Sequence, residues 1–491
     1  MEYIRLNHQY ALRHGRQCSY VVKRNGSYDD SILPGTNSFS IIPKYIGSIV
    51  SALGFRPYDK DIITISKELG VKESTLRSFL ERLVENEKPL SLLDGTNEVI
   101  FPKRFLVKQD NRRNQNDRAI EYIKLLSKDM DSIFKPERPQ YPLNINLMIT
   151  NKCSTNCAYC YANRSIDEDL TTALMLDFIN HAKRIGVVNL TLTGGDLLMR
   201  KDSLQIFEAC IKSQFSLFIS TKTPQSEEYV RRLKSIGVNE VQFSLDSANT
   251  STLRRLLNVS DSYLDRVGSF FSACRNHKIK LSIRSVLTSQ NTSLEEINNL
   301  YYFLLRYDNI AKWTLTPMFH SEYILNNDNL CPENDKLAEI FAFTRGLNPP
   351  FSIFYNKLGE KGYLHTQYSD IADYISKGST CLANTTSVSI LCDGTCTVCE
   401  MLYKNPLFVL GNIKERTLEE IWNSDKAISI FDGNISRNFN SPCNSCQHLF
   451  ECKGDIFKHV CYVDVVKVHG MENGNQPDPK CPKCNKCNLI L

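Results

Sequence analysis

Three cysteines crowd into the stretch "ITNKCSTNCAYCYANRS", which begins at Ile149: Cys153, Cys157 and Cys160. Thiolates are soft ligands that suit zinc or iron–sulfur clusters. Three thiolates can hold three irons of a four-iron cube and leave the fourth iron open to a substrate or cofactor. Zinc is the alternative, but a structural zinc site takes a fourth Cys or His, and this stretch has no histidine near it. The spacing therefore favours an open iron–sulfur cluster.

The composition supports metal binding over disulfide formation. The chain has 491 residues, of which 18 are cysteines, and a formal net charge of +5 that neither demands nor excludes nucleic acid. Its polar N-terminus lacks the apolar segment of a signal peptide, and no apolar run reaches the roughly 20 residues of a membrane span. We therefore expect a cytoplasmic protein, in which clustered thiols bind metal.

Strand and helix patterns alternate from Leu143 onward and must position these cysteines. The candidate strands are "NINLMIT", "VVNLTLT", "FSLFIST", "VNEVQFSLD", "KLSIRSVLT" and "KWTLTPM". Six β-α repeats predict an α/β fold with a parallel sheet, open or partly closed as a partial, TIM-like (β/α)6 barrel. The carboxyl ends of such strands face one mouth, where these folds build active sites. Because the cysteines follow the first strand, we expect them at that mouth.

The three-cysteine loop resembles the signature of the radical S-adenosylmethionine (radical SAM) enzymes. The resemblance includes the aromatic Tyr159 before the last cysteine. It also includes "TGGD" after the second strand, which supplies Gly194, Gly195 and Asp196. It implies a 4Fe-4S cluster in the loop, S-adenosyl-L-methionine on the open iron, and glycines that let backbone approach the methionine amino group. The reduced cluster would cleave the cofactor to a 5′-deoxyadenosyl radical, which abstracts hydrogen from an unactivated carbon.

Three other strand ends extend this resemblance. "FSLDS" after the fourth strand resembles the family's Ser-x-Asp element and supplies Ser244 and Asp246. "ISTKT" after the third strand resembles the family's Ser-Thr-Asn-Gly element. Ser220 matches the Ser of that element, whereas Lys222 stands where the family has Asn. Arg284 on the fifth strand could pair with the cofactor carboxylate. The alternative for Arg284 is an ordinary salt bridge at the rim of the sheet.

The C-terminal region resembles the SPASM extension of radical enzymes that modify peptides and proteins. Cys381, Gly394 and Cys399 fit the first half of its pattern. The second half departs from the pattern, because position 456 is isoleucine where a cysteine is expected and the next cysteine is Cys461. The residues that do fit the second half are Cys443, Cys446 and Cys452.

This resemblance implies two auxiliary 4Fe-4S clusters. The first would use Cys381, Cys399 and Cys461, with Cys392 or Cys396 as a further ligand. Zinc is the alternative for this region, since paired Cys-x2-Cys units are also zinc-ribbon spacing. The second cluster would use one tail cysteine, for which we choose Cys481 over Cys484 and Cys487, together with Cys443, Cys446 and Cys452.

The first 108 residues predict a winged helix. Helical patterns at "IPKYIGSIVSALG", "DIITISKELG" and "KESTLRSFLERLVENE" precede a hairpin-like "LSLLDGTNEVIFPK" with an Asp-Gly turn. A winged helix usually reads DNA, but the last helical segment carries four glutamates, which would meet phosphates badly. Peptide-modifying members of the family resembled often begin with a small winged-helix element that binds a precursor's leader as an added strand. A purely structural cap is the other alternative.

We therefore predict a radical SAM peptide maturase that cross-links, for example through a thioether, or epimerises a ribosomally made precursor peptide. Its partners would be that precursor and an electron donor such as flavodoxin or ferredoxin, without membrane or nucleic acid. The alternatives are a formylglycine-generating oxidase like the anaerobic sulfatase maturases and an iron–sulfur redox sensor that binds DNA. The sequence names no catalytic acid or base. The expected domains are 1–108 for peptide recognition, 109–142 for a linker and helix, 143–325 for the barrel, 326–377 for a connecting segment and 378–491 for SPASM.

Overall fold

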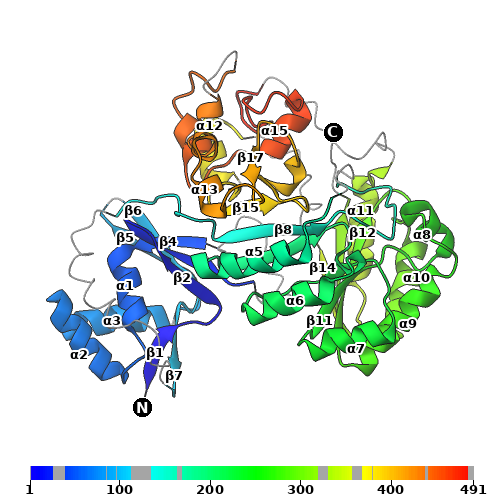
Figure 1. Ribbon diagram of the computed structural model, residues 1–491, viewed down its shortest axis with the longest axis horizontal. Coiled ribbons are helices and arrows are strands. Elements are labelled where there is room, and N and C mark those ends of the chain that lie inside the picture. The colour runs from blue at the N-terminus through cyan, green and yellow to red at the C-terminus, as the bar shows by residue number, and fades with distance from the viewer. Residues whose placement is uncertain are drawn as a thin grey trace. The chain divides into compact units, whose positions relative to one another are not determined.

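A computed structural model of the chain describes residues 2–25, 39–84, 86–95, 97–111, 134–162, 168–318, 330–355, 368–378, 380–436 and 441–484. The chain divides into two compact units, Met1–Leu143 and Asn144–Leu491 (Figure 1). The helix that we expected in the linker 109–142 falls on residues 112–133, which lie outside the described residues. Among the described helices, none is long and apolar enough to cross a membrane.

The N-terminal unit combines small antiparallel sheets with three helices. Its strands are β1 (Tyr3–Leu6), β2 (Tyr10–His14), β3 (Cys18–Lys23), β4 (Phe39–Pro43), β5 (Leu90–Asp94), β6 (Asn97–Phe101) and β7 (Leu106–Gln109). Its helices are α1 (Lys44–Ala52), α2 (Tyr58–Leu69) and α3 (Glu73–Val84). The sheets are β2-β3-β4, β1-β7 and the hairpin β5-β6. The helices and the hairpin lie where the sequence predicts them, and their assignment as a winged helix stays a prediction.

Apolar residues at helical spacing fold these helices onto one core. Helix α3 buries Leu76, Leu80 and Leu83, which recur every three or four residues along one face. The ring of Phe79 meets Phe101 of β6 edge-on, with 6.1 Å between ring centroids. The wing-like hairpin is therefore packed against the last helix through aromatic contact.

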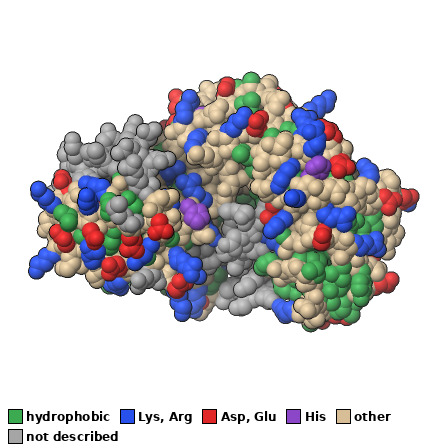
Figure 2. Space-filling view, turned by 90° about the horizontal axis from the view of Figure 1, so that it is seen from below, with side chains coloured by type: hydrophobic (Ala, Val, Ile, Leu, Met, Phe, Trp, Pro, Cys, Tyr) green, Lys and Arg blue, Asp and Glu red, His purple; other side chains and the backbone are tan. Residues whose placement is uncertain are grey.

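Charges of both signs are interspersed on the surface of this unit. Figure 2 shows Lys and Arg side chains alternating with Asp and Glu on the face of the N-terminal unit that it displays. Arg77 of α3, for example, pairs with Asp59 of α2 at 2.7 Å. DNA binding requires basic side chains gathered along one face, and the mixed surface seen here does not have that pattern.

The second unit is built on two five-stranded sheets. The first runs β10-β11-β12-β13-β14 and is parallel throughout. The second runs β17-β16-β15-β8-β9. Their strands are β8 (Asn144–Thr150), β9 (Asn189–Gly194), β10 (Ser220–Thr221), β11 (Glu240–Ser244), β12 (Lys280–Leu287), β13 (Ile310–Pro317), β14 (Ser352–Tyr355), β15 (Ser387–Ile390), β16 (Thr395–Thr397) and β17 (Val409–Asn412).

Helices alternate with the barrel strands, as the sequence predicts (Figure 1). Those of the barrel region are α5 (Thr172–Ile185), α6 (Ser203–Lys212), α7 (Glu227–Ser235), α8 (Thr250–Leu257), α9 (Tyr263–Asn276), α10 (Leu294–Leu304) and α11 (Asn334–Arg345). The C-terminal helices are α12 (Ile371–Lys377), α13 (Leu418–Trp422), α14 (Asp425–Phe431) and α15 (Tyr462–His469). The fold is thus the expected α/β partial barrel.

Two details of the barrel differ from the sequence prediction. The third strand is only Ser220–Thr221 instead of all of "FSLFIST", and it pairs with β11 but not with β9. The segment 326–377, expected as a connection, supplies α11 and β14, and β14 extends the sheet parallel to β13.

The C-terminal cysteine region continues the barrel's own sheet. Strand β15 pairs in parallel with β8, from Ser387 opposite Asn144 to Ile390 opposite Leu147. Strands β16 and β17 then extend the sheet in antiparallel fashion. The residues that follow β16 are consequently carried to the strand ends where the barrel opens.

Candidate functional site

A cavity of about 510 Å³ opens at the carboxyl ends of the barrel strands. The side chains and turns that we predicted from separate motifs meet on its wall. From the cysteine loop and the second strand come Cys153, Cys157, Tyr159, Cys160, Gly194, Gly195 and Asp196. From the later strands come Ser220, Ser244 and Arg284. Of the predicted site residues outside the C-terminal region, only Asp246 is not part of the wall.

The cysteine loop is tied to the end of α8. The backbone N–H of Asn156 donates to the carbonyl of Leu257 at 2.9 Å, and that of Ala158 donates to Leu256 at 2.8 Å. Cys153 is exposed, while Cys157 and Cys160 are partly buried. Within the described residues, no other cysteine and no histidine lines the cavity. Three thiols beside open space fit a 4Fe-4S cluster with one unligated iron.

The two glycines of "TGGD" are required by the cysteine loop itself. A Cβ atom on Gly194 would lie 2.2 Å from the carbonyl oxygen of Thr150, and one on Gly195 would lie 2.3 Å from that of Lys152. Gly194 also has a φ of +148°, which disfavours residues with a side chain. The N–H groups of Gly195 and Asp196 donate to Thr150 and Lys152, each at 2.8 Å. The glycines thus let the second strand end pack directly on the start of the loop.

Asp196 faces the cavity but is occupied by protein donors. Its carboxylate accepts hydrogen bonds from the hydroxyls of Thr221 and Thr223 and from the N–H of Lys222, each at about 2.8 Å. It also caps the short 3-10 helix Leu197–Met199 by accepting from the N–H of Leu198 at 3.0 Å. These contacts join the second and third strand ends, and the binding of cofactor by Asp196 stays a prediction.

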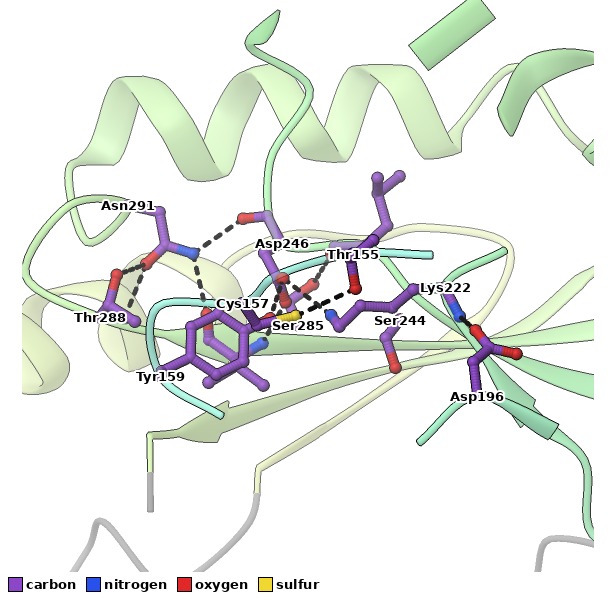
Figure 3. A network of polar contacts seen from close by, with 12 residues as sticks. Thr155, Cys157, Tyr159, Asp196, Lys222, Ser244, Asp246, Ser285, Thr288 and Asn291 are labelled. Carbon is purple, nitrogen blue, oxygen red and sulfur yellow. Dashed lines mark hydrogen bonds and ion pairs between the residues drawn. The ribbon is translucent and has the colours of Figure 1, made fainter. Parts of the chain in front are cut away.

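Asp246 is fully buried behind the cavity wall. Figure 3 shows it at the centre of a polar network that includes Tyr159 and Lys222. Its Oδ2 accepts a short hydrogen bond from the Tyr159 hydroxyl and pairs with the Lys222 ammonium at 2.9 Å, while its Oδ1 accepts from the N–H of Val286 at 2.8 Å. Asp246 thus holds the cysteine loop through Tyr159, and its predicted contact with the cofactor stays a prediction.

Burial and charge act together on this network. Burial, and then the Asp246 carboxylate, raise the pKa of Tyr159 well above its ordinary value, so the phenol stays protonated and donates. Burial lowers the pKa of Lys222, but Asp246 and the thiol of Cys157 outweigh it, so that its pKa is raised overall. Lys222 therefore remains an ammonium ion, and its nitrogen lies 5.4 Å from the centroid of the Tyr159 ring.

A second polar row runs along β10 and β11. The Ser220 hydroxyl donates to Gln242 at 2.8 Å, and the Gln242 amide donates to the Ser244 hydroxyl at 2.9 Å. Arg284 stands opposite Ser244 on β12 and is exposed on the cavity wall. The row presents hydroxyl groups and a guanidinium to the cavity, which suits a ligand with a carboxylate and ribose hydroxyls.

Among the wall residues that reasoning from the sequence missed are two from outside the barrel. Glu400 and Met401 line the cavity, although they belong to the C-terminal cysteine region. Burial raises the pKa of Glu400, while a hydrogen bond from Thr193 lowers it. Within the described residues, the Glu400 Oε2 atom is buried without a hydrogen-bond partner. Their position directly after Cys399 was the only available signal, and it says nothing about the barrel.

The first predicted auxiliary set is brought together from distant parts of the chain. The N–H of Cys381 donates to the carbonyl of Lys458 at 2.8 Å, which places it beside the segment leading to Cys461. Burial is the main cause of the raised pKa of both Cys399 and Cys461, and the nearby Cys381 raises each further. Cys399 and Cys461 are thus both influenced by Cys381, and a cluster shared by the three thiols stays a prediction.

The second predicted set also converges. Burial raises the pKa of Cys452 to about 12, and Cys481 and Cys443 add to this effect through charge. Cys481 in turn is influenced by Cys443 and Cys446. The tail cysteine that we chose, Cys481, is thus close to the other three members of the set.

Of four further candidate ligands, the three within the described residues have different surroundings. Cys392 is buried with Met148, Leu391 and Tyr403, and the Cys396 thiol points toward the carbonyl of Gly394 at 4.0 Å. Cys484 lies 3.7 Å from the Nε2 atom of His469. Cys487 lies outside the described residues. These positions favour Cys392 and Cys396 as packing residues rather than cluster ligands.

Comparison with known protein families matches two parts of the second unit to two different domains. Residues 147–300 match the radical SAM superfamily. Residues 381–447 match SPASM, an iron-sulfur cluster-binding domain. These two domains imply 4Fe-4S clusters and S-adenosyl-L-methionine as cofactors.

Individual relatives are distant in sequence. The PqqA peptide cyclase of Xanthomonas axonopodis pv. citri (strain 306) is 23% identical over 299 residues, which are 60% of this chain and 77% of that protein. The crystal structure of Streptococcus suis SuiB has a TM-score of 0.63 and 16% identity, covering 97% of this chain and 99% of that one. SuiB bound to the precursor peptide SuiA has a TM-score of 0.61 and 18% identity, covering 98% and 100%. The likeness to SuiB shows that the fold is shared along nearly the whole chain.

Proposed function

Because the chain carries a radical SAM domain and an SPASM iron–sulfur domain, we propose that it is a radical SAM enzyme that modifies a ribosomally made precursor peptide. One observation carries the proposal. The three-cysteine loop, the "TGGD" turn and two residues of the SPASM domain all line a single cavity of about 510 Å³. A radical formed at the loop would meet its target in space that the SPASM domain helps to shape.

The site residues hold and shield the cofactors in this proposal. S-adenosyl-L-methionine, once bound at a reduced cluster, supplies a radical that abstracts hydrogen. Cys153, Cys157 and Cys160 would hold that cluster, and the hydroxyl row of β10 and β11 with Arg284 would orient the cofactor. Asp246 lies behind the cavity wall, and its full burial keeps water from the hydrogen bond that anchors the loop.

The SPASM domain contributes the face toward the peptide. Glu400 brings a carboxylate oxygen without a partner among the described residues, and Met401 brings an adaptable apolar surface. A peptide amide or a basic side chain would satisfy that oxygen. The auxiliary clusters would accept the electron that bond formation releases, and Cys399 of the first predicted set directly precedes Glu400. Flavodoxin or ferredoxin would supply electrons to the chain.

The N-terminal unit would bind the leader of the precursor. The sheet β2-β3-β4 has two edge strands, to which an extended peptide can add by main-chain hydrogen bonds. The mixed surface charge of this unit, shown in Figure 2, favours a peptide over a nucleic acid. PqqA peptide cyclase and SuiB with its precursor SuiA are the known proteins that support a peptide substrate.

Anaerobic reconstitution followed by turnover tests this function. We expect on the order of twelve irons per chain, from three 4Fe-4S clusters. Adding a reductant and S-adenosyl-L-methionine should release 5′-deoxyadenosine, and a small peptide encoded beside the gene should lose hydrogen or change stereochemistry, as seen by mass spectrometry and chiral amino-acid analysis. Absence of 5′-deoxyadenosine from iron-replete protein would overturn the assignment.

Two comparisons separate the alternatives. Deleting residues 1–108 should weaken binding of the full precursor but leave slow cofactor cleavage, and unchanged affinity would assign this unit another role. Conversion of the Cys or Ser residue of a sulfatase peptide to formylglycine would favour the alternative function, that of an anaerobic sulfatase maturase. A gel shift with genomic DNA fragments, without peptide binding, would favour the redox regulator.

A further inference from the structure

Lys222 brings a positive charge to the end of β10, beside the cysteine loop. It occupies the position where the resemblance to radical SAM enzymes expects Asn. Its side chain lines the cavity, is only 15% exposed, and reaches across toward the ring of Tyr159 (Figure 3). The backbone around it is held on both sides, because its N–H donates to Asp196 and its carbonyl accepts from the Tyr263 hydroxyl at 2.7 Å. The ammonium group is thus fixed in place rather than mobile on the surface.

Two opposite charges lie beside the cysteine loop at this position. The Lys222 ammonium lines the same cavity as the three cysteines, and it pairs with the Asp246 carboxylate at 2.9 Å. Asp246 directs its oxygens to the Tyr159 hydroxyl and the Val286 N–H as well as to Lys222, and these donors offset part of its charge.

We propose that Lys222 tunes the iron–sulfur cluster of the Cys153, Cys157 and Cys160 loop by raising its reduction potential. The cluster gains one electron when it is reduced, so its net charge becomes more negative by one. A fixed positive charge nearby stabilises that reduced form, and its effect is larger because Lys222 is only 15% exposed. The inference rests on the cluster assigned under the proposed function, and it adds an electrostatic role for a residue that was not among the predicted site residues.

A redox titration of the reconstituted enzyme tests this role without any peptide. The readout is the electron paramagnetic resonance signal that changes when S-adenosyl-L-methionine is added, because this change marks the cluster of the loop. Lys222→Met should make one-electron reduction about tenfold less favourable, equivalent to a potential about 59 mV lower. Asp246→Asn removes the opposing charge and should shift the potential upward.

Two further variants separate charge from structure. Lys222→Arg keeps the charge and should keep the wild-type potential, and the double variant Lys222→Met with Asp246→Asn should fall between the single variants. A purely structural role predicts shifts of the same direction in both single variants, or none, and either result would overturn the proposal. If Lys222→Met fails to retain the cluster, the Asp246→Asn titration alone decides, since an unchanged or lowered potential contradicts the proposal. Failure of the cluster assignment itself would look different. Protein with the expected iron content would then show no signal that changes when S-adenosyl-L-methionine is added.

Discussion

The two cysteine regions of this protein are assembled in different ways. The radical SAM cysteines lie within eight residues, on one loop that follows β8 and is anchored to the end of α8. The first SPASM set joins Cys381 to Cys461, two residues separated by most of the C-terminal domain, through a backbone contact between Cys381 and Lys458. One site is local in sequence, and the other exists only after the chain has folded.

This difference corresponds to a difference in what surrounds the thiols. The loop of Cys153, Cys157 and Cys160 lines the cavity, whereas Cys381, Cys399 and Cys461 are not part of its wall. A set of thiolates beside a cavity can bind a cofactor at its metal, and a set away from the cavity is suited to passing electrons. We therefore propose chemistry for the local site and electron transfer for the distant one, and the following experiments test that division.

The largest effect is expected from removing the local site. Replacing Cys153, Cys157 and Cys160 together by Ala should remove about a third of the iron and abolish cleavage of S-adenosyl-L-methionine. Iron analysis and chromatography of 5′-deoxyadenosine provide the measurements. Cleavage that survives the triple change would move the chemistry to another site.

Removing a member of the distant site should separate cofactor cleavage from peptide modification. Cys381→Ala and Cys461→Ala should each abolish peptide modification and spare uncoupled cleavage, because both disrupt the same buried cluster. Cys392→Ala is the matched control, since Cys392 packs with Met148 and Leu391. If Cys392→Ala behaves like the other two variants, the assignment of Cys392 to packing is wrong.

The close packing under the local site should be sensitive to a single methyl group. Gly195→Ala would place its Cβ 2.3 Å from the Lys152 carbonyl oxygen, and we expect it to lower the free energy of unfolding by about 1–3 kcal/mol. Urea denaturation measures this effect. Gly346→Ala is the control, because its nearest neighbour would lie at 3.3 Å. Equal stability of the two variants would show that the loop can move to accept the methyl group.

The smallest effect is expected at the point where the distant region reaches the local site. Glu400→Gln keeps the shape of the side chain but removes its charge, and it should slow peptide modification about tenfold through a weakened charge-assisted hydrogen bond. Uncoupled cleavage of the cofactor should be unchanged. Glu415→Gln, at an exposed position, is the control. If the Glu400→Gln variant also cleaves the cofactor more slowly, Glu400 contacts the cofactor rather than the peptide.

The sequence alone was sufficient for features that depend on short stretches of chain. The cysteine loop and "TGGD" each follow a strand, so their types and spacing could be read without knowing the fold. The barrel strands were equally readable, because buried parallel strands are continuous apolar runs. The same reasoning overextended β10 and did not find β14, since a short strand takes its hydrogen bonds from neighbours that the local sequence does not reveal.

The tertiary structure decided the contacts between distant residues. It paired β15 with β8, and so brought Glu400 to the cavity beside Thr193. It also joined Asp196 and Asp246, both predicted as cofactor ligands, to residues at the end of the third strand, with Lys222 as a charged partner of Asp246. A motif specifies which groups are available, but burial and hydrogen-bond partners determine which of them are free to meet a ligand. Those depend on strand order and packing, which no local spacing encodes.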